Sequence, residues 1–173
     1  CDIKKFFANI DHEVLRDILA GYIPDKDISW LLGQVIDSFS TGTKGVGLPL
    51  GNLTSQLLVN IYMNRFDQFV KHRLMAKYFI RYADDFAFFS ANKNWPISVV
   101  PKIEKFLNND LKLELHPDKV FIQALASGVD FLGWVHFPDH RVLRAVTRRR
   151  MEKKLAERKN SERVASYLGL LQH

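Results

Sequence analysis

The chain has 173 residues, of which 47% are hydrophobic and 12% aromatic, and it carries a net charge of +6. This length and composition indicate one globular domain, or one and a fraction, and exclude a disordered chain. No apolar run approaches the roughly 20 residues that a membrane span needs, no signal peptide is recognisable, and the single cysteine excludes an internal disulfide framework. The six histidines show no metal-ligand spacing.

Helices and strands are predicted in turn along the chain. Apolar spacing predicts helices over 12–20, 25–39, 53–74, 98–109 and 147–173, and strands over 2–7, 77–82, 86–91, 112–115, 119–125 and 129–137. Residues 40–51 hold four glycines and a proline and are predicted to form a loop whose bare backbone lets a substrate approach closely.

The order of these elements predicts an α+β fold of the ferredoxin-like βαββαβ type. Such a fold has an antiparallel sheet with helices on one face. Residues 1–143 would form this domain, and residues 144–173 would begin a second, helical one.

Two adjacent carboxylates, Asp84 and Asp85, stand between the two strands of a predicted β-hairpin. Aspartate is a good turn former, which explains one of them well and two of them poorly. A divalent cation is the functional alternative, because Mg²⁺ takes carboxylate and phosphate oxygens. In the predicted sheet the end of the first strand lies beside this turn, so Asp2 is expected to converge with Asp84 and Asp85.

Three converging carboxylates can hold two Mg²⁺ ions, or Mn²⁺ in their place, about 3.5–4 Å apart. Asp2 and Asp84 are predicted to bridge the two ions and Asp85 to support them, with the carbonyl of Ile3 as a further backbone ligand. Such a pair of ions serves phosphoryl transfer, which needs mainly alignment and charge neutralisation.

The positive charge is concentrated near the C-terminal end. Residues 141–163 hold ten basic and three acidic residues, so this block carries +7 and the rest of the chain −1. Five of its side chains are predicted to contact nucleic-acid phosphates, as an alternative to a merely solvated face: Arg148, Arg149, Arg150, Lys153 and Lys154.

Five motifs, in this order and spacing, resemble those of the palm and the start of the thumb of reverse transcriptases. They are Asp2–Phe7, Gly47–Gln56, Tyr82–Asp85, Leu113–Lys119 and Phe131–Trp134. The resemblance covers essentially the whole chain and implies an RNA-directed DNA polymerase with a palm over 1–143 and a thumb that begins at 144. It implies as partners an RNA template, a DNA or RNA primer and deoxynucleoside triphosphates, in the cytoplasm of a bacterium or phage-infected cell and with no membrane.

The same resemblance assigns roles to further residues. Phe7 would lie under the sugar of the incoming nucleotide, Leu50 and Gly51 beneath the nascent base pair, and Lys119 near the triphosphate. Phe131, Leu132, Gly133 and Trp134 would form the primer grip. The plainer interpretations are that Phe7 and Trp134 belong to the core and that Lys119 is a solvated charge.

The sequence Leu50-Gly51 followed by Ser55-Gln56 departs from the usual family pattern and resembles reverse transcriptases of diversity-generating retroelements. An apolar Leu50 would forgo a hydrogen bond to the incoming nucleotide, which implies error-prone copying, with a structured retroelement RNA and an accessory protein as further partners. The alternative is a reverse transcriptase of the group II intron or retron type.

Two other functions compete with a polymerase. One is an RNA-binding module of polymerase descent that has lost its chemistry, and the other is a cyclase-like or primer-synthesising enzyme. The intact carboxylates argue against the first, and the primer-grip-like and basic segments argue against the second. Both ends of the chain lack start and stop signals, so we expect a piece of a longer protein that folds but polymerises little by itself.

Overall fold

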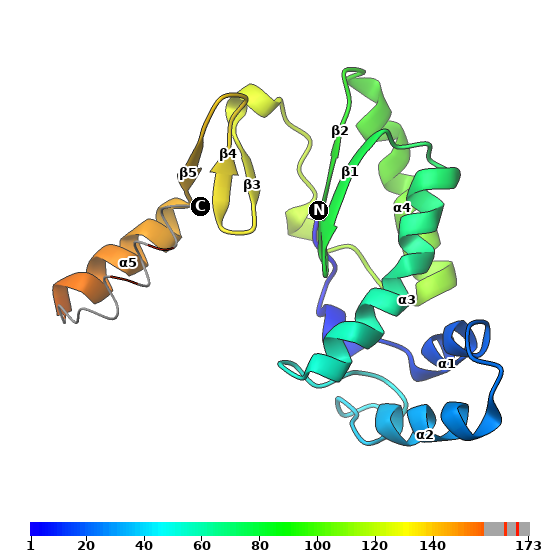
Figure 1. Cartoon of the computed structure of the whole chain (residues 1–173). Coiled ribbons are helices and arrows are strands. Elements are labelled where there is room, and N and C mark those ends of the chain that lie inside the picture. The colour runs from blue at the N-terminus through cyan, green and yellow to red at the C-terminus, as the bar shows by residue number, and fades with distance from the viewer. Residues whose placement is uncertain (158–164, 166–168, 170–173) are drawn as a thin grey trace. The chain divides into compact units, whose positions relative to one another are not determined.

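The computed structural model describes residues 1–157, 165 and 169. The chain divides into two compact units, unit 1 of Cys1–Ile122 and unit 2 of Gln123–His173 (Figure 1). Both combine helices with antiparallel strands, so the fold is α+β as predicted. No helix in the described part of the chain is long and apolar enough to cross a membrane.

Unit 1 contains four α-helices and one named two-stranded sheet among its described residues. The helices are α1 (His12–Ala20), α2 (Lys26–Asp37), α3 (Leu53–His72) and α4 (Asn94–Leu111), and the strands are β1 (Tyr78–Tyr82) and β2 (Asp85–Phe89). The predicted ends of α1 are confirmed, because Asp11 caps it by accepting a hydrogen bond from the amide of Val14. Figure 1 shows α3 and α4 running along one side of the β1–β2 hairpin.

The core of unit 1 lies between that hairpin and the two long helices. Tyr62, Phe66 and Val70 of α3 are fully buried, and so are Leu107 and Leu111 of α4. The Tyr62 hydroxyl donates to the carbonyl of Leu111 at 2.7 Å, which satisfies the one polar atom of this buried side chain. The predicted helix over 53–74 is therefore confirmed, and one face of it is buried.

The segment Cys1–Lys4 lies between β2 and residues 114–116. Cys1 and Phe86 exchange two backbone hydrogen bonds, at 2.9 and 3.0 Å, on one side. On the other side the carbonyl of Asp2 accepts from the amide of His116 at 2.9 Å. The predicted strand 2–7 is nevertheless short: it makes one bridge, Ile3 to Leu115, before Lys5 turns the chain at φ 46 and a 3₁₀ helix, η1 (Phe6–Asn9), begins.

Unit 2 contains a three-stranded antiparallel sheet and the helix α5 (Ala145–Glu157). Its strands are β3 (Val129–Phe131), β4 (Trp134–His136) and β5 (Arg141–Leu143). The predicted single strand over 129–137 is wrong. Leu132 and Gly133 have φ of 51 and 86 and form a two-residue turn that pairs Phe131 with Trp134, and turns with positive φ match the twist of a hairpin.

The predicted strand 119–125 is also wrong. The chain forms 3₁₀ turns, η2 (Pro117–Lys119) and η3 (Leu125–Ser127), with no strand between them. The side chain of His116 accepts from the amide of Asp118 and so begins the first turn.

Helix α4 begins at Asn94, four residues before its predicted start. The side chain of Asn92 accepts from the amide of Asn94 at 2.9 Å, and Pro96 lies in the first turn, where its missing N–H costs nothing. Pro101 consequently lies inside the helix rather than in its first turn.

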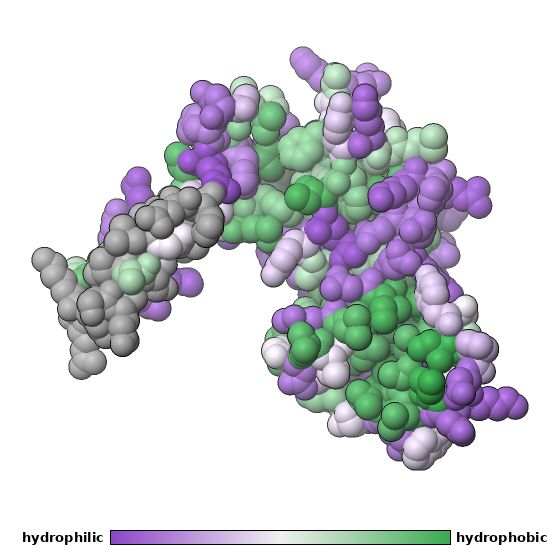
Figure 2. Space-filling view, in the orientation of Figure 1, coloured by the Kyte–Doolittle hydropathy of each residue, from purple (hydrophilic) through white to green (hydrophobic). Residues whose placement is uncertain are grey.

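Helix α2 leaves most of its large apolar side chains exposed. Ile36 is buried, whereas four of its large apolar side chains are at least two-fifths exposed: Ile28, Trp30, Leu31 and Val35. Figure 2 shows apolar side chains gathered over the end of unit 1 that contains α1 and α2. The predicted helix over 147–173 is confirmed from Thr147 to Glu157, and its remainder lies outside the described residues apart from positions 165 and 169.

Candidate active site

The candidate site lies at the turn of the β1–β2 hairpin, where the sequence predicted it. Tyr82 pairs with Asp85 across the hairpin, and Ala83 and Asp84 form the turn between them. Ala83 has a φ of 52, in the left-handed region that residues with a Cβ rarely adopt. The turn thus displays Asp84 at its tip and begins β2 at Asp85.

The segment Cys1–Lys4 brings Asp2 to the same end of the hairpin. Ile3 is 1% exposed and points into the core, so Asp2 and Lys4 lie on the opposite face of the segment. The hydrogen bonds between Cys1 and Phe86 fix Asp2 close to the start of β2.

Asp84 is half-buried, and the pKa of its carboxyl is raised. Burial is the largest cause, and the negative charges of Asp2 and Asp85 act in the same direction. A carboxylate whose pKa is raised by two other carboxylates lies near both of them. These directions agree with the convergence of the three aspartates, which stays a prediction.

Lys119 lies in the same group of charges. Its ammonium group donates to the carboxylate of Asp2, and this hydrogen bond is the main reason why the pKa of Lys119 is raised. The sequence assigned Lys119 to the triphosphate and did not indicate its pairing with Asp2.

Asp2, Asp84 and Asp85 have the donor chemistry that Mg²⁺ prefers, because they supply carboxylate oxygens. In the described part of the chain, however, no group of three His, Cys, Asp or Glu side chains converges closely enough to hold a metal ion. The donor types of Asp2, Asp84 and Asp85 fit a hard cation.

A partly buried ion pair joins the hairpin to α3. Arg81 on β1 binds Asp67 on α3 through two hydrogen bonds, Nε to Oδ1 at 2.8 Å and Nη2 to Oδ2 at 2.6 Å. Its Nη1 donates to the carbonyl of Ala83 at 3.0 Å. Sequence reasoning missed this pair, since fourteen positions separate the partners and no spacing rule links a helix to the following strand.

Phe7 and the glycine-rich loop also lie together. The amide of Leu48 donates to the carbonyl of Phe7 at 2.8 Å, and the ring of Phe7 packs edge-on against the buried Phe6, with 5.4 Å between centroids. Phe7 is half-buried, whereas Leu50 is 78% exposed and Gly51 has a φ of 87. The residues assigned to the nucleotide are thus partly accessible.

A histidine that the sequence did not single out holds this loop. His12 of α1 is 1% exposed, and its Nε2 donates to the carbonyl of Gly47 at 2.7 Å. Its Nδ1 lies 3.4 Å from the carboxylate of Asp37 on α2. His12 therefore ties the loop to both helices.

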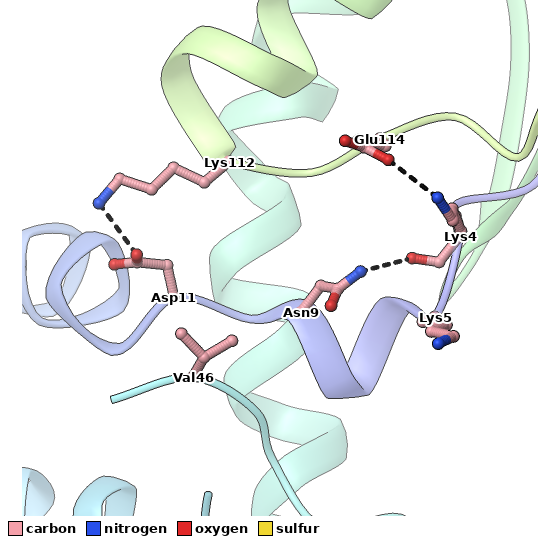
Figure 3. Close-up of a pocket in the computed structure, with 7 residues that line it drawn as sticks. All are labelled: Lys4, Lys5, Asn9, Asp11, Val46, Lys112 and Glu114. Carbon is pink, nitrogen blue, oxygen red and sulfur yellow. Dashed lines mark hydrogen bonds and ion pairs between the residues drawn. The ribbon is translucent and has the colours of Figure 1, made fainter. Parts of the chain in front are cut away.

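A hollow of about 420 Å³ lies along the same segment of unit 1 (Figure 3). Lys4 pairs with Glu114 at 3.3 Å, and Lys112 pairs with Asp11 at 2.9 Å across the hollow. Both pairs join residues more than a hundred positions apart. They fasten the segment that carries Asp2, and the helix that follows it, to residues 112–114.

Unit 2 carries the residues assigned to the primer and to nucleic-acid phosphates. Phe131 and Trp134 flank the turn of the β3–β4 hairpin, and Leu132 and Gly133 form that turn. The guanidinium of Arg141 lies 4.7 Å from the ring centre of Trp134, within the range of a cation–π interaction. The five predicted basic side chains of α5 are all exposed: Arg148, Arg149, Arg150, Lys153 and Lys154.

Curated proteins with similar sequences include three from different organisms. Protein YkfC of Escherichia coli (strain K12) is 25% identical over 186 residues, which cover 85% of this chain and 47% of that protein. The putative COX1/OXI3 intron 2 protein of Saccharomyces cerevisiae is 23% identical, over 77% of this chain and 23% of the relative. The group II intron-encoded protein LtrA of Lactococcus lactis subsp. cremoris is 25% identical, over 88% of this chain and 36% of the relative.

The chain thus spans less than half the length of these curated relatives. A family model described as reverse transcriptase (RNA-dependent DNA polymerase) matches residues 1–136, a range that includes all five motifs. The chain belongs to the reverse transcriptase family.

Proposed function

We propose that this chain is the palm, and the start of the thumb, of an RNA-directed DNA polymerase that extends a primer 3′-hydroxyl with deoxynucleoside triphosphates. The observation that carries the proposal is the pair of backbone hydrogen bonds between Cys1 and Phe86, because Asp2 follows Cys1 and Asp85 precedes Phe86. These acids come from segments more than eighty residues apart in a member of the reverse transcriptase family.

Each residue of the candidate site has a task in this proposal. Asp2, Asp84 and Asp85, with the carbonyl of Ile3, would hold two Mg²⁺ ions, or Mn²⁺ in their place. When bound, these ions supply a Lewis acid that activates the primer hydroxyl and neutralises charge on the phosphates. Lys119 holds its ammonium beside Asp2, and would turn towards the triphosphate when a divalent cation replaces it there.

Phe7, Leu50 and Gly51 would receive the nucleotide, and Phe131–Trp134 would hold the primer end. The exposed basic residues of α5 would bind template–primer phosphates, which position a duplex without reading its sequence. The palm would end at 143 and the thumb begin at 144.

The palm sheet would be ferredoxin-like, with residues 114–116 at one edge, then Cys1–Lys4, β2 and β1. The backbone hydrogen bonds of Cys1 with Phe86 and of Asp2 with His116 support this order. Each of these contacts joins segments that a βαββαβ topology makes neighbours.

Two subfamilies are consistent with these residues. Leu50-Gly51 with Ser55-Gln56 supports a diversity-generating retroelement, in which the enzyme would copy a structured RNA with an accessory protein. The names of two relatives refer to introns and support a group II intron type of reverse transcriptase or maturase. In either subfamily the enzyme would be encoded by a bacterium or a phage and would work in the cytoplasm. A nearby imperfect repeat pair in the DNA would identify the first, and intron ends the second.

The decisive experiment is primer extension by the complete protein with Asp84→Asn. Synthesis should fall below detection while the far-ultraviolet circular dichroism spectrum stays unchanged. Asp110→Asn is the matched control, because Asp110 is an exposed acid on α4 and should keep normal synthesis. Near-normal extension by Asp84→Asn would show that Asp84 is not a catalytic ligand, whereas an RNA-binding module that has lost its chemistry would show no extension even by the wild type.

A further inference from the structure

One side chain, that of Arg81, connects the turn that carries Asp84 to helix α3. Arg81 uses three N–H groups at once: two bind the carboxylate of Asp67 on α3, and one binds the carbonyl of Ala83. We call Asp67, Arg81 and the Ala83 carbonyl the Arg81 clamp. We propose that Arg81 and Asp67 are positioning residues that hold the Ala83–Asp84 turn in one position and orientation relative to helix α3.

The clamp reaches the one residue whose backbone sets the turn. Ala83 has a φ of 52, a conformation that a residue with a Cβ leaves unless its surroundings hold it. Its carbonyl is the acceptor for Arg81 Nη1, and its peptide bond leads directly to Asp84. Loss of this hydrogen bond would free Ala83 to relax, and Asp84 would move with it.

The clamp is bidentate and partly buried, beside a hollow that Asp67 and Arg81 help to line. The side chain of Arg81 is 9% exposed and that of Asp67 is 26% exposed. A planar guanidinium holds a carboxylate through two parallel bonds, which fixes direction as well as distance.

Helix α3 gives the clamp a fixed base. Phe66, the neighbour of Asp67, is fully buried and packs against Phe86 with 5.1 Å between ring centres. Phe86 follows Asp85 directly. Two successive residues of α3 thus hold both sides of the turn, Asp67 through Arg81 and Phe66 through Phe86.

Lysine cannot replace arginine in this geometry. Its ammonium is a point charge on a flexible stem, so it can pair with Asp67 but cannot bind both carboxylate oxygens and the Ala83 carbonyl in one plane. Arg81→Lys therefore keeps the charge balance and removes the positioning.

The inference rests on the proposed function, in which Asp84 is a metal ligand, so its test measures the turn and the metal separately. In the whole chain, Arg81→Lys should speed hydrogen exchange in the peptide that spans residues 79–88. It should also weaken Mn²⁺ binding by roughly 10- to 100-fold, the usual effect of removing a group that orients a ligand. Asp67→Asn should do the same more mildly, because the amide keeps one acceptor oxygen.

The matched control is Arg16→Lys. Arg16 of α1 also pairs with an aspartate on a neighbouring helix, Asp37, but both side chains are about half exposed and lie on other elements than the hairpin. The Arg16→Lys variant should leave hydrogen exchange over residues 79–88 and the Mn²⁺ affinity unchanged. Circular dichroism at the working temperature confirms that each variant is folded, and Asp67→Asn carries the test if Arg81→Lys unfolds.

The outcomes separate the two claims. If Asp84→Asn abolishes Mn²⁺ binding while Arg81→Lys and Asp67→Asn change neither exchange nor affinity, the clamp is overturned and the metal site stands. If Asp84→Asn leaves Mn²⁺ binding intact, the proposed metal site fails, and faster exchange over 79–88 in Arg81→Lys still supports the clamp.

Discussion

Lys119 and Asp2 form an ion pair across 117 positions of the sequence, and it occupies the carboxylate proposed to bind metal. An ammonium group and a divalent cation cannot both hold this carboxylate in the same way. The protein therefore carries its own competing cation.

Removing that competitor should tighten metal binding. Lys119→Ala should raise the Mn²⁺ affinity of the nucleotide-free chain about 1.4- to fivefold, since exposed ion pairs are worth roughly 0.2–1 kcal/mol. Calorimetric titration would measure it. Lys112→Ala is the control, because Lys112 pairs instead with Asp11 and should leave the affinity unchanged. An unchanged or weaker affinity in Lys119→Ala would contradict direct competition.

The raised pKa of Asp84 predicts how stability depends on pH. Because the folded carboxyl binds its proton more tightly than the unfolded one, its contribution to stability is fully present below the ordinary aspartate pKa. It is lost as pH rises through the raised pKa. Asp84→Asn removes this loss, so without metal it should melt at a higher temperature than the wild type near neutral pH.

The difference in melting temperature should disappear in acid, below the ordinary aspartate pKa. Thermal melts at a series of pH values, with chelator present, would measure it. A lower melting temperature for Asp84→Asn at neutral pH would show that the carboxylate stabilises the fold instead.

Phe7 is predicted to select the sugar of the incoming nucleotide. It is half-buried, packs on Phe6, and accepts a backbone hydrogen bond from Leu48 of the glycine-rich loop. Misplacement of about 1 Å can cost on the order of a hundredfold in rate, so a small clash with a 2′-hydroxyl suffices. Phe7→Ala in the complete protein should admit ribonucleotides with a smaller loss of deoxynucleotide use.

Phe6→Ala is the matched control for this experiment. Phe6 is 2% exposed, so its removal should cost about 3–5 kcal/mol of stability and leave sugar preference unchanged. Incorporation assays and melting curves on both variants separate packing from selection. A large fall in melting temperature for Phe7→Ala, without ribonucleotide incorporation, would identify Phe7 as core.

The exposed basic face of α5 is predicted to give salt-sensitive binding to duplex nucleic acid. Replacing Arg149, Arg150 and Lys154 with Gln should flatten the slope of log affinity against log salt by about 0.9 for each phosphate that the variant no longer binds. Binding titrations at several salt concentrations would measure the slope. Three lysines of unit 1, Lys71, Lys77 and Lys102, are exposed controls whose replacement should leave it unchanged.

The sequence predicted well wherever one local rule decided the structure. Asp11 and Gly21 bound α1 because a side-chain cap and a helix end act within a few residues. The turn at Asp84 was also predictable, because strand-forming residues flank it, although Asp85 proves to begin β2. The convergence of Asp2 on that turn is argued from topology rather than from spacing, and it stays a prediction.

The predictions that failed, and the contacts that were missed, depend on interactions that no local sequence pattern encodes. The apolar run over 129–137 hides a turn at Leu132-Gly133, since leucine is rare at positive φ and gives no turn signal. The exposed apolar side chains of α2 keep helical spacing, and periodicity cannot tell an exposed face from a buried one. The Arg81 clamp and the Lys119–Asp2 pair depend on the three-dimensional arrangement of distant segments.

The location of Cys1–Lys4 between Phe86 and residues 114–116 has a consequence for the order of folding. The β1–β2 hairpin closes over a few residues and can form early, whereas the pairing of Asp2 with His116 joins positions more than a hundred residues apart. Contacts at such separation form late, because the loop between them must first be ordered. In a partly folded chain Asp84 and Asp85 would therefore already lie at the hairpin turn while Asp2 was still unpaired with His116. The assembly of all three aspartates would be the final step of refolding.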